Sequence, residues 1–170
     1  MRDNTNNYWE QLERLEKLIK AAELKAGVIF SYHSLILGLF VDRFENFEEA
    51  FQDSVIFTIC FIIWLLLVLI SIYYCFRCFK PNMELKYDKN VFFFRDAVYK
   101  FGSIKEYSKT LRQICATDKS IVKQLSEQIH AESVIIEKKF YDVKKAIQFF
   151  ILSFIAVIIS FGAWISFSIS

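Results

Sequence analysis

Apolar residues in this chain gather in three long blocks, and charged residues are concentrated between them. The charge-free blocks cover residues 26–41, 55–76 and 146–170. A helix needs roughly 20 apolar residues to cross the hydrocarbon core of a bilayer, so the second and third blocks are long enough. The first covers roughly 24 Å as a helix and spans only with local thinning or anchored flanks. An interfacial or re-entrant helix is the alternative for this block.

Composition favours helices in lipid over a soluble sheet. The chain is 55% hydrophobic and contains 19 Phe, four Gly and one Pro. Few turn residues beside long apolar runs leave little room for hairpins. We therefore expect an all-α membrane protein with three transmembrane helices and a cytoplasmic helical region between spans two and three. The expected parts are an N-terminal amphipathic cytoplasmic helix (1–25), transmembrane helix 1 (26–41), a short acidic external loop (42–54), transmembrane helix 2 (55–76), a basic cytoplasmic helical region (77–145) and transmembrane helix 3 (146–170).

The charges between the blocks predict an orientation. Residues 1–25 carry five Lys or Arg and five acids, residues 42–54 carry one against five, and residues 77–145 carry fifteen against nine. Because Lys- and Arg-rich segments stay in the cytoplasm, we expect a cytoplasmic N-terminus and an external C-terminus. The fifteen cations are mixed with acids and no nucleic-acid motif accompanies them, so we expect no nucleic-acid partner.

An apolar stripe at heptad spacing marks the N-terminal segment. It comprises Tyr8, Leu12, Leu15, Ile19, Ala22 and Ala26. Such a stripe is typical of a helix that packs against another helix. Packing on the chain's own middle helices is the simpler interpretation, and a separate coiled coil is the alternative. The stripe leads directly into the first block, so helix and span are expected to be continuous.

Local signals complete the helical prediction. Phe44, Phe47 and Phe51 share one helical face, which favours a short helix on the outer membrane surface. Residues 86–101 are ambiguous between helix and strand. Ser103 and Glu106 form a capping-box pattern that begins a helix. No Gly or Pro interrupts the chain from Ile121 to Gly162, so we expect one long helix to run from the cytoplasm through the membrane.

Small residues on one face allow transmembrane helices to pack closely. Within an arc of about 60° to 80° at helical spacing, the first block places Gly27, Ser31, Ser34 and Gly38, and the third places Ser153, Ala156, Ser160 and Ala163. The second block, with Trp64, is bulky on every side, so we expect it to face lipid. His33 is the ionisable group inside a span; such a residue is a functional candidate, and a bond to a neighbouring hydroxyl is the structural alternative.

Catalytic and metal-binding patterns are missing from the sequence. Cys75 and Cys78 form a CxxC, but no second pair follows, and neither His33 nor His130 stands at a zinc-site spacing. A phosphate-binding Gly loop, a nucleophile elbow and an HExxH motif are all absent. We therefore expect no metal, no cofactor and no enzymatic activity. Palmitoylation is a possible role for the two thiols.

Three stretches together resemble the transmembrane effectors of bacterial Pycsar anti-phage systems. They are Glu23–Gly27, then Asn90–Asp96 with Ser103 and Glu106–Tyr107, and then Gln128–His130 with Ile136, Lys139–Phe140 and Lys144–Ala146. The likeness covers nearly the whole chain, and Arg95 stands where the family pattern has a small residue. The resemblance implies that a partner cyclase makes cyclic CMP or cyclic UMP. The effector, in an oligomer, then impairs the bacterial inner membrane.

The resemblance also points to candidate ligand residues. A phosphate prefers Arg or Lys, whereas a base prefers an aromatic face with amide or hydroxyl partners. In the family-like stretches these types are Arg95, Lys100, Tyr107, Gln128, His130 and Lys139. Two alternatives stand beside this function. One is a membrane scaffold whose cytoplasmic helices hold a partner protein, and the other is a holin-like toxin that needs no ligand.

Overall fold

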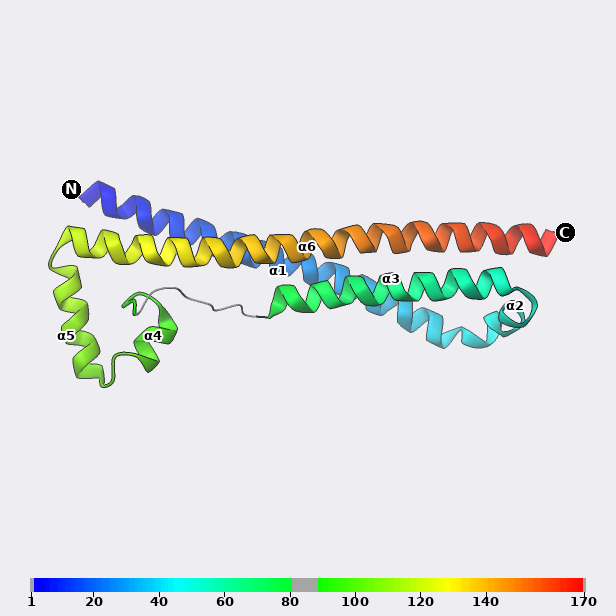
Figure 1. Cartoon of the computed structure of the whole chain (residues 1–170), viewed down its shortest axis with the longest axis horizontal. Helices are drawn as coiled ribbons and strands as arrows, with labels where there is room; N and C mark the ends of the chain where they lie inside the picture. The colour runs from blue at the N-terminus through cyan, green and yellow to red at the C-terminus, as the bar shows by residue number, and fades with distance from the viewer. Residues whose placement is uncertain (1, 81–88, 170) are drawn as a thin grey trace. The chain divides into compact units, whose positions relative to one another are not determined.

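The chain folds entirely into helices. The computed structural model describes residues 2–80 and 89–169, with the backbone alone at residues 2–4, 46, 49, 50, 53 and 163–169. Figure 1 shows the elements, which are α1 (Arg2–Asp42), the 3₁₀ helix η1 (Phe44–Phe47), α2 (Glu48–Asp53), α3 (Val55–Phe79), α4 (Phe94–Tyr99), α5 (Ile104–Cys115) and α6 (Asp118–Ile169). Within the described residues there is no strand, and α1, α3 and α6 are long and apolar enough to cross a membrane. The expected all-α membrane fold is confirmed.

Two compact units divide the chain. The polar unit comprises residues 1–21 and 82–138, and the membrane unit comprises residues 22–81 and 139–170. The helices α1 and α6 each contribute to both units, so the predicted continuity of soluble helix and span is confirmed for both. Since α1 is unbroken from Arg2 to Asp42, a re-entrant hairpin is excluded for its apolar part.

Small side chains form the centre of the membrane unit. Its buried cluster takes residues from all three long helices: Ala22, Ala26 and Ile29 of α1, Cys75 and Cys78 of α3, and Val143 and Ala146 of α6. Small side chains let helix backbones approach closely. The resulting van der Waals contacts hold helices together in lipid, where the hydrophobic effect does not drive their association. The predicted N-terminal stripe is confirmed in both units, because Leu12 and Leu15 are buried in the polar unit and Ala22 and Ala26 in the membrane unit.

The second span packs against its neighbours along one face, so the expectation that it faces lipid is wrong for that face, whereas its other large apolar side chains are exposed. One face of α3 is buried, with Trp64, Val68, Ser71, Cys75 and Cys78 alternating at intervals of four and three residues. The Ser71 hydroxyl donates a hydrogen bond to the Ala146 carbonyl of α6 at 2.9 Å. The sequence did not reveal this stripe, because it combines the bulky Trp64 with small and medium-sized residues of mixed polarity, and bulky residues also cover the rest of α3.

Aromatic rings hold the connection between α1 and α3. The Phe40 ring stacks on Phe47 of η1 at 5.2 Å and on Phe61 of α3 at 4.5 Å between centroids. Phe51 of α2 meets Phe61 edge-on at 5.1 Å. The phenylalanines of the predicted short helix therefore pack on the two spans that they join. Ser54 caps α3 by accepting a bond from the Phe57 amide.

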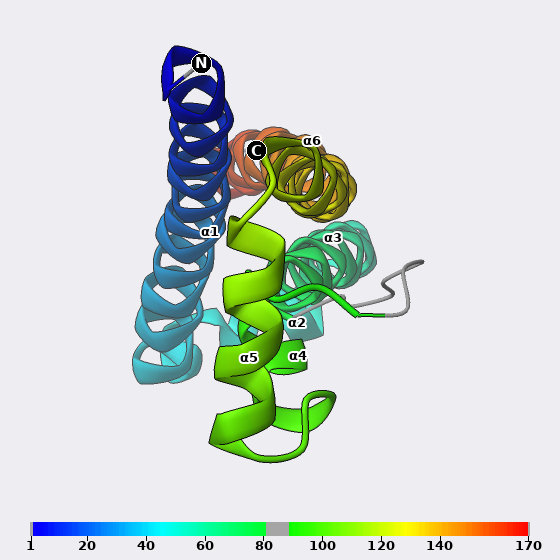
Figure 2. The ribbon, with the colours of Figure 1, turned by 90° about the vertical axis from the view of Figure 1, so that its left-hand side faces the viewer.

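In the polar unit, α5 lies beside the segment that contains α4 (Figure 2). The predicted capping box begins α5: the Glu106 amide donates to the Ser103 hydroxyl, and the Ser103 amide donates to the Glu106 carboxylate. Gly102 precedes it with φ +66°, a left-handed conformation that glycine adopts at little cost. The ambiguous residues before it contain the single-turn helix α4 and, where described, no strand.

Candidate functional site

A polar clamp holds the aromatic segment before α4 in place. Asn90 and Asp96 are both almost fully buried, and the backbone amide of Asn90 donates to the Asp96 carboxylate at 2.9 Å. The Asn90 side chain accepts a bond from the Phe92 amide at 2.9 Å and donates to the Gln124 carbonyl of α6 at 2.7 Å. Buried polar groups are stable only when paired, and here they pair with one another across six residues of chain.

Two further side chains complete this clamp. The Gln124 side-chain oxygen accepts a bond from the Val91 amide at 3.0 Å, so α6 holds two consecutive residues of the segment. The Tyr107 hydroxyl of α5 donates to the Val91 carbonyl at 3.1 Å. The clamp therefore holds the backbone at Val91, next to Phe92, through bonds from α6 and α5.

Phe92 forms one wall of an open pocket in the polar unit. The pocket has a volume of about 410 Å³ and is lined by Trp9, Leu12, Glu13, Glu16, Phe92, Gln128 and Glu132. Ligand sites for small molecules occupy roughly 300–1,000 Å³, so this volume suits one small ligand. The Trp9 and Phe92 rings meet edge-to-face at 5.3 Å between centroids, which leaves ring faces available for a planar ligand.

Two residues that line this pocket each carry a buried side-chain oxygen without a hydrogen-bond donor. The Gln128 amide donates to one oxygen of Glu132 at 2.8 Å, but Gln128 Oε1 and Glu132 Oε2 are buried without a partner. Gln128 is 7% exposed. Burial raises the pKa of the Glu132 carboxyl above its ordinary value, the Gln128 hydrogen bond lowers it in part, and the Glu16 charge raises it further. Both oxygens are fully buried and do not face the open pocket, so their unmet hydrogen bonds are a cost to the fold.

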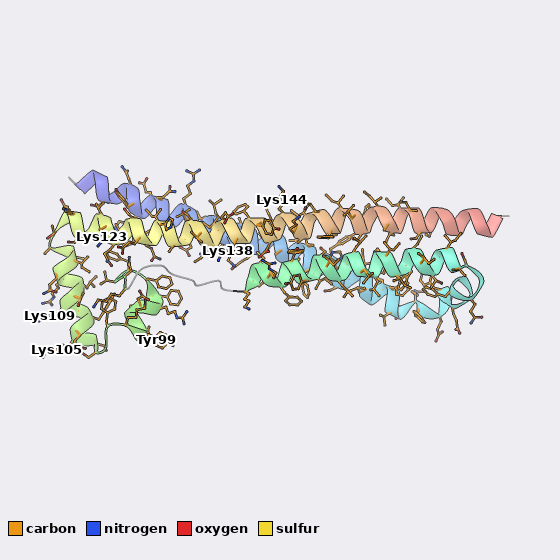
Figure 3. The ribbon with its side chains drawn as sticks, in the orientation of Figure 1. Tyr99, Lys105, Lys109, Lys123, Lys138 and Lys144 are labelled. Carbon is orange, nitrogen blue, oxygen red and sulfur yellow. The ribbon has the colours of Figure 1, made fainter. Side chains whose placement is uncertain are left out.

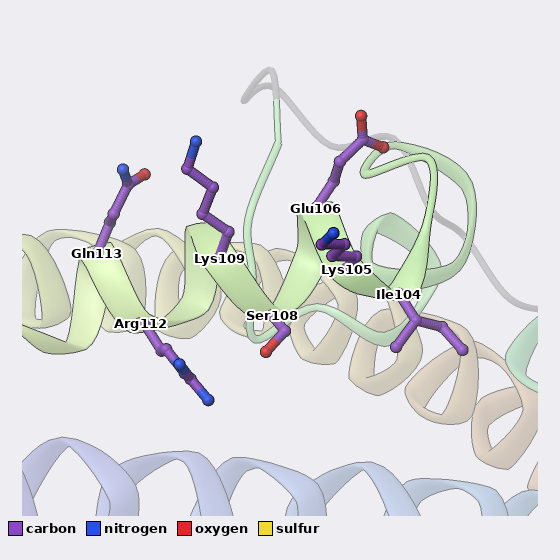
Figure 4. A pocket seen from close by; sticks show the side chains of 7 residues that line it. All are labelled: Ile104, Lys105, Glu106, Ser108, Lys109, Arg112 and Gln113. Carbon is purple, nitrogen blue, oxygen red and sulfur yellow. The ribbon is translucent and has the colours of Figure 1, made fainter.

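A larger hollow over α5 is a poor ligand site. It measures about 910 Å³, but all its lining residues come from α5 itself. Figure 4 shows that Lys109 and Gln113 point to one side of the helix whereas Ser108 and Arg112 point to the other. Lys105 and Lys109 project away from the protein in Figure 3 as well. A binding site needs convergent groups, and these side chains diverge.

Lys139 lies in the membrane unit, where it joins three helices. Its side chain is 6% exposed and forms an ion pair with Glu23 of α1 at 2.8 Å. The Lys139 ammonium also donates to the Cys78 carbonyl near the end of α3. The last carbonyls of a helix have no intrahelical donor, so Lys139 caps α3 from α6. One turn along α6, the buried Asp142 carboxylate lies 3.3 Å from Arg77, within ion-pair distance but without hydrogen-bond geometry.

The six candidate ligand residues take different positions. Gln128 lines the pocket described above. Arg95 and His130 are exposed on α4 and α6, and Lys100 forms an ion pair with Asp96 at 3.1 Å. Tyr107 supports the clamp, and Lys139 caps α3. Of these six residues, Gln128 is thus the one that lines this pocket.

The small-residue faces are divided between buried and exposed positions. On α6, Ser153 is buried and Ala156 and Ser160 are half-buried, and the Ala163 side chain lies outside the described residues. On α1, Gly27 is half-buried while Ser31, Ser34 and Gly38 are exposed. Within this chain α1 instead buries Ala22, Ala26, Ile29 and His33. The Ser31, Ser34 and Gly38 face of α1 is therefore exposed in the single chain.

His33 and the two cysteines of the CxxC are buried in the membrane unit. His33 is 2% exposed, its ring meets the Phe150 ring at 5.2 Å, and its Nε2 has no hydrogen-bond partner among the described residues. Cys75 and Cys78 are free thiols with no exposed surface, which argues against palmitoylation. Within the described ranges, no group of three or more His, Cys, Asp or Glu side chains is placed to hold a metal ion.

Sequence reasoning missed Trp9, Phe92 and Glu132 as pocket residues. They come from α1, the clamped segment and α6, and no local spacing connects them. Trp9 offered one signal in the sequence, because this large aromatic residue stands beside the heptad stripe and not within it. In the folded chain its side chain is 46% exposed. The clamp residue Asn90 offered another, because a polar residue opens an otherwise apolar run there.

Comparison with known proteins assigns the family. No curated protein and no solved structure matches the chain. A family model described as the Pycsar effector protein domain matches residues 7–166. The match includes the pocket, the clamp, Lys139 and all three candidate spans. The chain therefore belongs to the Pycsar effector protein family, as a multi-pass transmembrane member.

Proposed function

We propose that this Pycsar effector responds to cyclic CMP or cyclic UMP, supplied by a partner nucleotide cyclase, by impairing the bacterial inner membrane. The observation that carries the proposal is the family match over residues 7–166, which includes both a polar unit and three candidate spans in one chain. One chain therefore contains both the part that would receive the signal and the part that would act on the bilayer. A second type of effector subunit is not required. The effector acts without enzymatic chemistry.

The nucleotide binds in the Trp9–Phe92–Gln128–Glu132 pocket. Its base lies against the aromatic rings, where a planar π-system gains contact area. The described lining residues include no Lys or Arg, so the phosphate stays at the rim. We assign Lys17 and Lys20 to the phosphate, because they form ion pairs with the lining residues Glu13 and Glu16 at 2.6 and 2.7 Å. The bound phosphate competes with these carboxylates for the two ammonium groups.

Transmission runs along the two helices that contribute to both units. Both α1 and α6 pass from the pocket into the membrane unit without a break. The N-terminus and the region from 77 to 145 face the cytoplasm in this proposal, as the charge distribution favours, and the C-terminus is external. The exposed face of Ser31, Ser34 and Gly38 packs against further copies in an oligomer, and repacking there opens the bilayer.

Calorimetric titration of the full chain in detergent tests the proposal. We expect heat and saturable binding with cyclic CMP or cyclic UMP, and none with cyclic AMP at the same concentration. A scaffold would bind neither pyrimidine nucleotide and leave loaded vesicles intact. A ligand-independent toxin would also bind neither, but would release dye from vesicles on insertion alone. Either pattern would refute the proposed function.

A further inference from the structure

Two cations mark one end of the apolar blocks of α3 and α6. Arg77 directly follows the charge-free block of α3, and Lys145 directly precedes that of α6. The two ends lie at one level, because Cys78 of α3 and Ala146 of α6 belong to the same buried cluster. Arg77 and Lys145 therefore lie where the hydrocarbon core of a bilayer gives way to its headgroups.

Aromatic rings join α3 to α6 beside these cations. Tyr74 of α3 stacks on Phe149 of α6 at 5.8 Å between centroids. The Arg77 guanidinium lies 5.5 Å from the centre of the Tyr74 ring. Lys145 precedes Phe149 by about one helical turn, and its ammonium lies 5.8 Å from the centre of the Tyr141 ring. We call these five residues the α3–α6 seam, which combines one Arg and one Lys with an aromatic stack.

Both cations of the seam keep hydrogen-bond donors for a further partner. The buried Asp142 carboxylate lies 3.3 Å from Arg77, but its nearer oxygen accepts no hydrogen bond from the guanidinium. The Arg77 side chain is 44% exposed, so the other edges of its fork face outward. Within the part of the chain that the structure describes, Lys145 contacts the Tyr141 ring and no acid.

Positive charge is in surplus around the seam. Residues 22–25, 77–80 and 139–145 of the membrane unit carry the cations Lys25, Arg77, Lys80, Lys139, Lys144 and Lys145 against the acids Glu23 and Asp142. Both acids already lie within ion-pair distance of Lys139 or Arg77. Lys25, Lys80 and Lys144 are exposed. The surplus attracts an anion to the level of the seam.

We propose that the α3–α6 seam binds the phosphate of an anionic phospholipid. Arg77 presents its fork to two phosphate oxygens, and Lys145 adds a second charge-assisted bond. Exposed apolar side chains continue along both helices, including Ile70 of α3 and Ile151 of α6, and these contact the acyl chains. A soluble phosphate has no acyl chains, so the apolar surface beside the cations favours the lipid. The site lies in the membrane unit and needs no nucleotide, so it stands or fails separately from the proposed function.

Native mass spectrometry of the full chain tests the site. The protein is released from detergent after mixing with equal amounts of phosphatidylglycerol and phosphatidylcholine, and the retained lipid is identified. We expect the parent to prefer phosphatidylglycerol at least roughly tenfold, because each cation near a membrane surface strengthens binding of an anionic lipid several-fold. The double change Arg77→Gln and Lys145→Gln should bring the two lipids close to parity. Lys145→Gln alone removes no ion pair and should lower the preference several-fold.

Two controls separate the seam from net charge. Lys105→Gln with Lys109→Gln removes the same charge from exposed positions of α5 (Figure 3) and should keep the parent's preference. Arg77→Lys with Lys145→Arg keeps both charges in the seam and should also keep most of it. An unchanged preference in K145Q, or an equal loss in the α5 variant, would overturn the proposal. Displacement of phosphatidylglycerol by an equal concentration of glycerol phosphate would assign the seam to soluble phosphates and overturn it as well.

Discussion

Replacing Lys139 with methionine should lower the stability of the membrane unit by about 3 kcal/mol, the largest single effect we expect. Methionine keeps the length of the side chain but removes its donors. The Cys78 carbonyl then loses its capping partner, and the Glu23 carboxylate loses its ion pair. Glu23 is 40% exposed, so water offsets part of the lost pair, and most of the cost arises at the buried carbonyl.

Thermal unfolding in detergent micelles, followed by helical circular dichroism, measures this effect. Lys144→Met is the matched control, because Lys144 is exposed on the same helix and its replacement should leave the transition nearly unchanged. Glu23→Gln should cost far less than Lys139→Met, since the amide oxygen still accepts a bond from the ammonium group. Equal transitions for the Lys139 and Lys144 variants would refute the capping role.

Replacing Asn90 with alanine should release the clamped segment before α4. The change removes the acceptor of the Phe92 backbone amide, which loses its bond, and the side-chain donor to the Gln124 carbonyl, which lies inside α6 and keeps its helical bond. An unpaired buried group costs roughly 1–3 kcal/mol, so the local cost is about 2 kcal/mol. Hydrogen exchange of residues 90–101 in the full chain should accelerate strongly, while exchange in α3 should stay slow.

An aspartate at the same position separates shape from chemistry. Asn90→Asp keeps the acceptor for the Phe92 amide but sets a carboxylate against the Gln124 carbonyl and near Glu127. It should therefore release the segment at least as much as Asn90→Ala does. Gln113→Ala, on the exposed face of α5, should leave exchange unchanged. Normal protection of the segment in N90D would show that the clamp contributes little.

The helices could be predicted because their signals are local. Charge-free blocks, the heptad stripe from Tyr8 to Ala26 and the Ser103–Glu106 capping box all act within one helix or one turn, and the structure has each of them. The packing of α3 could not be predicted in this way. Its buried face combines Trp64 and Val68 with the smaller Ser71, Cys75 and Cys78, so no single size or polarity marks it in the sequence.

The roles of polar residues depended on tertiary contacts. Lys139 and Tyr107 have the chemistry of ligand groups, yet their partners in the fold are the Cys78 and Val91 carbonyls. Those partners lie in other helices or loops, and nothing near either residue in the sequence reveals them. Gln128 is the candidate that lines a pocket. The other walls include Trp9 and Phe92, which come from distant segments, so the sequence around Gln128 could not reveal the pocket.

The most direct test of the central claim is nucleotide-dependent leakage from vesicles that contain the purified chain. Vesicles of phosphatidylethanolamine and phosphatidylglycerol, loaded with a self-quenched dye, should stay intact until cyclic CMP or cyclic UMP is added and then release the dye. Release should follow the same concentration dependence as calorimetric binding, and cyclic AMP should cause none. Vesicles that stay intact when a cyclic pyrimidine nucleotide is bound, or that leak equally without one, would contradict a nucleotide-activated membrane effector.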